Sequence, residues 1–139
     1  MLNSTIAVIS YNTPHRKTQD VLFHLKAKNY PHVHVFALPF IHRENPFVPI
    51  FQHRPSRAID LSPEVFCSHL GYQFSTTTSD TLNDQLHNLK ADFILIAGAG
   101  LLPNQLVEQH KIINAHPGYL PFTRGLDSLK WAILSLIHI

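Results

Sequence analysis

Short apolar runs alternate along the chain with longer stretches whose apolar residues recur at helical spacing. The β-branched run at residues 5–10 and the apolar run at 32–38 each predict a strand. The run at 93–97 ends before two glycines and predicts a fully buried parallel strand. Residues 112–116, closed by a Pro-Gly pair, predict one more short strand.

Helix signals fall between these strands. Thr13 and Pro14 predict the start of a first helix, which would bury one face carrying Val21, Leu22 and Leu25.

A second helix is predicted by Ser62 as N-cap and Pro63 in the first turn, with a stop near Gly71. A third helix should be capped by Ser79 or Asp80 and carry three leucines at helical spacing, Leu82, Leu86 and Leu89.

Two further helices are expected, one after Pro103 and one at the end of the chain. The alternation of strand and helix predicts an α/β fold with a doubly wound, mainly parallel sheet and right-handed crossovers. At 139 residues the chain is the size of one domain, residues 1–139.

Composition narrows the function classes. The residues are 45% hydrophobic and 14% charged with a net charge of +2, too small a positive charge to indicate a nucleic-acid-binding protein. The single Cys67 excludes an internal disulfide. Neither a signal peptide nor a membrane-spanning run is apparent, so the cytoplasm is the expected location. Eleven histidines raise the question of a metal site, but they form no zinc-type spacing with Cys67, so no metal is expected.

Asn114 and His116 are the strongest candidates for chemistry. They alternate along one predicted strand, so their side chains should share a face. Ligands of parallel sheets bind at the carboxyl ends of the strands, where Gly98 and Gly100 also fall.

The stretch around these two residues resembles the 10-formyltetrahydrofolate-dependent formyltransferases. The family signature is Asn-x-His-Pro followed by Leu-Pro and Arg-Gly. The matching positions are Asn114, His116, Pro117, Leu120, Pro121, Arg124 and Gly125.

This resemblance implies a Rossmann-like formyltransferase fold and transfer of a formyl group from 10-formyltetrahydrofolate to an amine. Asn114 would donate a hydrogen bond to the oxygen that becomes negative, and His116 would donate another and move a proton. The substrate would meet Tyr11, Asn12, Arg124 and Gly125. The loop that holds the folate pterin would be Ala97, Gly98, Ala99, Gly100, Leu101, Leu102 and Pro103.

One departure from the family concerns an Asp that orients the catalytic His. Family members carry it well downstream, whereas the Asp that follows His116 here, Asp127, lies at the start of the final helix. We therefore expect a chain that is C-terminally incomplete and truncated before the catalytic Asp. Two alternatives to amine formylation stay open, namely a formyltetrahydrofolate hydrolase and a non-catalytic folate-binding fragment.

The sequence leaves the acceptor amine open among amino-sugar nucleotides, aminoacyl-tRNA and other small amines. Expected partners are therefore this amine and folate, with nucleic acid only if the acceptor is a tRNA, and no membrane; a homodimer is also compatible with the sequence. His15, Arg16 and Lys17 could meet a phosphate at the first helix, or be ordinary solvated residues of a first turn. Residues 40–57 are either a substrate loop or a surface loop.

Overall fold

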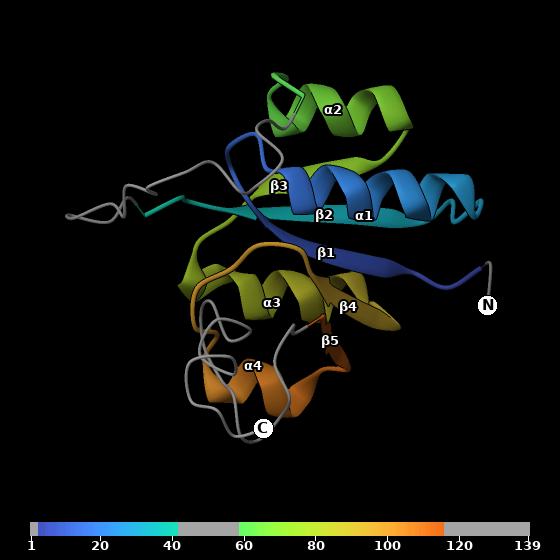
Figure 1. Cartoon of the computed structure of the whole chain (residues 1–139). Helices are drawn as coiled ribbons and strands as arrows, with labels where there is room; N and C mark the ends of the chain where they lie inside the picture. Colours follow the sequence, from blue (N-terminus) through green and yellow to red (C-terminus); the bar gives the residue numbers. More distant parts are fainter. Residues whose placement is uncertain (1–2, 42–58, 116–139) are drawn as a thin grey trace, which may run out of the picture.

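The computed structural model describes residues 3–41 and 59–115. Within them, the strands form one parallel sheet in the order β3-β2-β1-β4-β5 (Figure 1). The strands are β1 Ile6–Tyr11, β2 Val33–Leu38, β3 Gln73–Thr76, β4 Phe93–Ile96 and β5 Ile112–Asn114. The helices are α1 Arg16–Ala27, α2 Pro63–Leu70, α3 Ser79–Leu89 and α4 Asn104–Gln109.

Helices cover both faces of the sheet. One face packs against α1 and α2, and the other against α3 and α4 (Figure 1). Val8 and Val35 meet Leu22 of α1 on the first face. The second face holds Ile9 and Phe36 of the sheet together with leucines of α3 and α4, Leu82, Leu86 and Leu106. The predicted doubly wound α/β architecture is confirmed.

The described part of the chain contains no helix that is both long and apolar enough to cross a membrane. Cys67 of α2 is buried in the first face, where burial raises the pKa of its thiol to about 11. The thiol therefore packs as a small apolar group.

The signals of α2 are confirmed, since the Ser62 hydroxyl accepts a hydrogen bond from the Val65 amide and Gly71 ends the helix in the left-handed conformation. The expected start of α1 and the expected cap of α3 are wrong. α1 begins at Arg16 with His15 as N-cap, so the Thr13-Pro14 pair precedes it. α3 is capped by Thr78 in a capping box, in which the Thr81 hydroxyl accepts a hydrogen bond from the Thr78 amide at 3.2 Å.

Two expectations about strands also need correction. The sequence does not predict β3, because its Gln-Phe-Ser-Thr stretch has one apolar residue and no run to indicate a strand. β4 is not fully buried: Ile94 is enclosed, but Phe93 is 39% exposed. The last described strand, β5, ends at Asn114.

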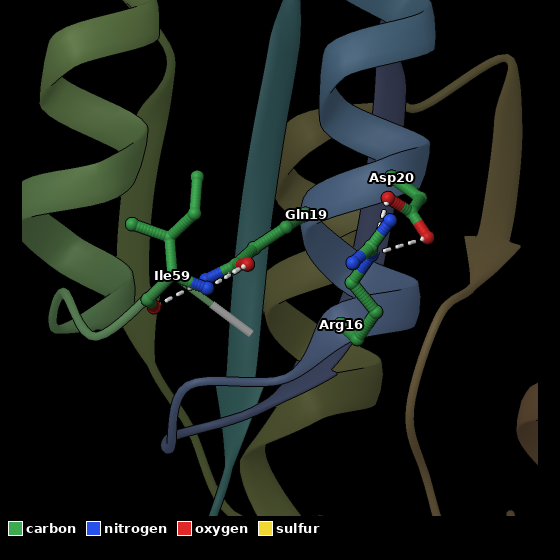
Figure 2. A network of polar contacts seen from close by, with 4 residues as sticks. All are labelled: Arg16, Gln19, Asp20 and Ile59. Carbon is green, nitrogen blue, oxygen red and sulfur yellow. Dashed lines mark hydrogen bonds and ion pairs between the residues drawn. The ribbon is translucent and has the colours of Figure 1, made fainter. Parts of the chain in front are cut away.

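Two polar pairs on α1 differ in kind (Figure 2). The buried Gln19 side-chain amide donates to the Ile59 carbonyl at 2.8 Å and accepts from the Ile59 amide at 2.7 Å. It thereby satisfies both backbone groups of Ile59, three residues before the α2 N-cap. Arg16 and Asp20 form an ion pair at 2.8 Å with half of each side chain exposed.

Replacing Gln19 with Ala should lower the free energy of unfolding by about 1–3 kcal/mol, because the Ile59 amide loses its partner and the Ile59 carbonyl keeps only the Leu61 amide. Asp20→Ala is the matched control and should change it by less than about 1 kcal/mol, as surface ion pairs do. Urea unfolding of both variants measures the difference. Equal losses would contradict the anchoring role of Gln19.

The surroundings of His34 in β2 disfavour the charged form of its ring. Its ring stacks on Phe36 with centroids 4.3 Å apart, and its Nε2 lies 2.8 Å from the Ser75 hydroxyl. Its buried Nδ1 has no partner among the described residues. Burial lowers the pKa of His34 below its usual value. Burial, with a smaller contribution from a neighbouring positive charge, lowers the pKa of His15 as well.

The free energy of unfolding should therefore fall as the pH drops below about 6.5, because the unfolded chain binds protons that the native histidines resist. Above that pH the stabilisation is fully present. His34→Gln should flatten this acid slope relative to that of the wild type. Urea titrations between pH 5 and 8 give both slopes, and an unchanged slope in His34→Gln would refute the assignment.

Candidate functional site

The strand register places Asn114 at the carboxyl edge of the sheet. Ile9 pairs with Ile96, and Ile96 pairs with Asn114, so the three residues form one row across β1, β4 and β5. Alternation from Ile112, which packs on the α4 side, puts Asn114 on the face covered by α3 and α4. Asn114 is exposed there, so its side-chain amide does not pack in the hydrophobic core.

A cleft of about 500 Å³ opens at the same edge. One wall is the loop between β4 and α4, from Gly100 through Leu101 and Leu102 to Pro103. Four of the seven residues predicted to hold the pterin thus line one cavity. A Cβ added at Gly100 would meet nothing within 4 Å, so this position opens onto free space.

The other three residues of that predicted loop have different surroundings. Ala97 is buried on the α1 side of the sheet, and its amide donates to the Ile9 carbonyl at 2.9 Å. Ala99 packs against the core on the α3 side. Gly98 lies beneath the ring of Tyr11. These three residues pack against the rest of the protein and hold the loop in place, and they do not line the cleft.

The opposite wall of the cleft comes from the ends of β1, β2 and the start of α3. Tyr11, predicted as a substrate residue, is part of it, whereas its neighbour Asn12 is exposed and donates its amide to the Leu38 carbonyl at 2.7 Å. Sequence reasoning missed the rest of this wall except Ile41, which falls in the candidate substrate loop at residues 40–57. Its residues are Leu38, Pro39, Ile41, Thr78, Ser79, Asp80 and Leu82.

One residue of the missed wall could have been predicted from the sequence. Pro39 directly follows a predicted strand, so the rule that ligands bind beyond the carboxyl ends of strands would have included it. Thr78, Ser79 and Asp80 follow β3, the strand that the sequence does not indicate. Without β3, the sequence indicates only the helix-capping role of such residues.

Tyr11 is held on three sides. Its ring meets His15 edge-on at 5.5 Å and Phe40 edge-on at 5.1 Å. A Cβ at Gly98 would lie 2.7 Å from Tyr11 Cδ2, closer than real atoms approach. The absence of a side chain at residue 98 is therefore what lets the ring lie against the end of β4.

His15 belongs to a chain of hydroxyl contacts behind Tyr11. Its Nδ1 lies 2.9 Å from the Thr18 hydroxyl, which lies 2.7 Å from the Ser10 hydroxyl. Burial and the charge of Lys17 hold the pKa of His15 below its usual value. Because Arg16 is paired with Asp20, two of the three residues considered for phosphate binding already have partners within the helix.

His116, Arg124 and Gly125 lie outside the described residues, so their predicted roles remain predictions. Among the residues that the structure describes, no group of three or more His, Cys, Asp or Glu side chains could hold a metal ion.

Gly98→Ala should displace the Tyr11 ring, since the new methyl group would overlap it, and should cost about 1–3 kcal/mol of stability. Gly100→Ala is the control, because open space surrounds that position. Thermal unfolding and the NMR signals of the Tyr11 ring measure both effects. Normal Tyr11 signals in Gly98→Ala would show that the ring is not confined as described.

The chain is similar to known proteins in sequence and in fold. The sequence matches the family described as formyl transferase over residues 42–135. A methionyl-tRNA formyltransferase from a Nitratiruptor species is 37% identical over 65 residues, which are 46% of this chain and 22% of that protein.

A solved structure of similar fold is glycinamide ribonucleotide transformylase 1 from Symbiobacterium toebii, with a TM-score of 0.63 at 17% sequence identity. The likeness covers 96% of this chain and 61% of that one, and at such low identity it shows the fold alone. This chain therefore spans less than two-thirds of the length of each relative. Because the family match extends over more than half of its residues, the chain belongs to the formyl transferase family.

Proposed function

We propose that this chain carries the formyl-transfer site of an enzyme that moves the formyl group of 10-formyltetrahydrofolate to the amine of an acceptor. The observation that carries the proposal is the position of Asn114. Its exposed amide stands at the carboxyl edge of the sheet, on the same face as the cleft bordered by the Gly100–Pro103 loop. Asn114 also opens the Asn-x-His-Pro motif.

Asn114 would act on the formyl oxygen. When a neutral amine attacks the formyl carbon, a carbon–nitrogen bond forms and negative charge develops on that oxygen. The Asn114 NH₂ group can donate a hydrogen bond to it, and such a bond accelerates the reaction because it strengthens as the charge grows. The tetrahedral species then breaks its bond to the folate nitrogen.

A proton must pass from the attacking amine to the departing folate nitrogen for this step to balance. We assign this transfer to His116 on the strength of the motif, because imidazole exchanges protons near neutral pH. Arg124 and Gly125 are assigned to the acceptor on the same basis.

The cleft suits the folate co-substrate. Its volume of about 500 Å³ lies within the usual range for small-molecule sites, and leucines and prolines make up half of its lining residues. Gly100 leaves room for a flat ring to approach the backbone of the loop. Ser79 and Asp80, at the start of α3, supply polar groups on the opposite wall.

The first test is incubation with 10-formyltetrahydrofolate and each of three acceptors: methionyl-tRNA, glycinamide ribonucleotide and an amino-sugar nucleotide. The proposal expects a formylated product from one of them. Release of formate without any acceptor would instead indicate a hydrolase. Folate binding with neither reaction would indicate a non-catalytic fragment.

Asn114→Ala should reduce formyl transfer by about 100-fold or more while the affinity for a stable 10-formyltetrahydrofolate analogue stays within about twofold. Asn88→Ala, at an exposed position of α3, is the control and should leave both unchanged. Turnover assays and calorimetric titration supply the two values. Full turnover by Asn114→Ala would remove the residue from the mechanism.

Gly100→Phe should weaken binding of the same folate analogue by at least about tenfold, because the new ring would fill the cleft. Gly100→Ala should bind it nearly normally, since a methyl group meets no atom there. Calorimetry of the two variants compares them directly. Unchanged affinity in Gly100→Phe would place the folate elsewhere.

A further inference from the structure

Helix α4 depends on contacts with other elements for its position. It has six residues, Asn104–Gln109, and it buries one side chain, that of Leu106. No side-chain hydrogen bond caps its start at Pro103, and the chain is already extended at His110, directly after its end. A helix this short is not stable in isolation, so tertiary contacts must hold α4 in place.

The side chain of Asn83 joins the end of α4 to α3. Asn83 is half-buried on α3, and its Nδ2 donates a hydrogen bond to Gln109 Oε1 at 3.1 Å. Its Oδ1 lies 3.2 Å from Nε2 of His110, and because an amide oxygen can only accept, the histidine donates. Among the side-chain hydrogen bonds of the described residues, these two are the ones that join α3 to α4.

Apolar packing does not by itself fix the orientation of α4. Leu106 of α4 shares a core cluster with Leu82 and Leu86 of α3. One buried leucine still lets a short helix rotate, because apolar contacts are not directional. The two hydrogen bonds of Asn83 are directional and engage consecutive residues, so they fix the rotation of α4 about Leu106.

The two ends of α4 continue into two parts of the candidate site. Its start follows Pro103, the last residue of the loop that lines the cleft. Its end leads through Lys111, whose carbonyl accepts from the Ile94 amide at 2.9 Å, into β5. Because β5 has three residues and is an outer strand of the described sheet, its position depends on the segment before it. A rotation of α4 would therefore move both the cleft wall and Asn114.

Asn83 also lies next to the opposite wall of the cleft. α3 contributes Ser79, Asp80 and Leu82 to that wall, and Asn83 directly follows Leu82. α3 and α4 lie on the same face of the sheet (Figure 1). The Asn83 side chain thus connects the helix that carries one wall to the helix that follows the other.

We propose that Asn83 is a positioning residue, which holds the two cleft walls at their separation and keeps Asn114 at the edge of the sheet. Asn83 does not itself line the cleft, so it acts through Gln109 and His110. Its effect on formyl transfer rests on the proposed function. The attachment of α4 to α3 does not.

The first experiment is amide hydrogen exchange of the full chain, measured by NMR for the wild type and for Asn83→Leu. Leucine is similar to asparagine in shape but has no polar side-chain atom, so the substitution removes both hydrogen bonds. We expect about tenfold faster exchange in α4 and β5, with exchange in α1 unchanged. Unchanged exchange in α4 and β5 would overturn the proposal, whether or not the chain transfers formyl groups.

The second experiment is a double-mutant cycle on kcat, with whichever of the three tested acceptors the wild type formylates. Asn83→Leu should lower kcat about tenfold, because a small displacement of a catalytic group costs this much. When Asn114 is already replaced by Ala, adding Asn83→Leu should lower kcat by less than about twofold, because Asn83 acts through Asn114. A tenfold loss in both backgrounds would refute the positioning role.

Two more variants separate positioning from stability. Asn83→Asp keeps an acceptor for His110 but loses the donor to Gln109, so its kcat should lie between those of the wild type and Asn83→Leu. Ser62→Ala removes the N-cap of α2 on the other face and should lower the melting temperature while kcat stays unchanged. An equal loss of kcat in Ser62→Ala would attribute the effect of Asn83 to stability alone. If no acceptor is formylated, the proposed function fails, and hydrogen exchange still decides whether Asn83 holds α4.

Discussion

The close approach of β1 and β4 at their carboxyl ends is the constraint on which this edge of the protein depends. The amides of Ala97 and Gly98 both bond to the Ile9 carbonyl, at 2.9 and 3.0 Å, so the chain leaves β4 against β1. The Tyr11 ring then covers Gly98. From this one contact follow the direction of the loop that lines the cleft and the separation of the cleft from His15.

The two sides of this contact are stabilised by different interactions. Apolar packing dominates toward α3, where Leu38 and Leu102 join the core around Leu82. Toward α1 the interior contains hydroxyl and amide groups, namely Ser10, Thr18 and Gln19, each of which has a hydrogen-bond partner. Buried polar groups with partners fix a single arrangement more strictly than apolar contacts do, because their bonds are directional. The candidate site therefore lies between a hydrogen-bonded polar interior toward α1 and an apolar interior toward α3.

Sequence reasoning predicted the fold well because strong apolar runs mark β1, β2 and β4. The signals at Ser62, Pro63 and Gly71 were also sufficient for α2, since each acts through local backbone geometry. β3 could not be predicted in the same way, because its pairing with β2 rather than its composition makes it a strand. The error at α3 has a related cause: Thr78, Ser79 and Asp80 are all good capping residues, and tertiary contacts decide among them.

For the site, the Asn-x-His-Pro motif predicted Asn114, and the glycine-containing segment after β4 predicted Gly100–Pro103. Both lie at the carboxyl edge of the sheet. The motif could not indicate the wall at the start of α3. These residues are brought to the edge by packing between segments far apart in sequence, and no local pattern encodes that.

The burial of Cys67 has a practical consequence. With a pKa of about 11, roughly one thiol in ten thousand is ionised at pH 7, and the thiolate is the reactive form. Cys67 is the only cysteine of the 139 residues. The chain is therefore a ready host for a single engineered cysteine, at which a fluorophore or spin label would attach selectively and report motion of the cleft walls.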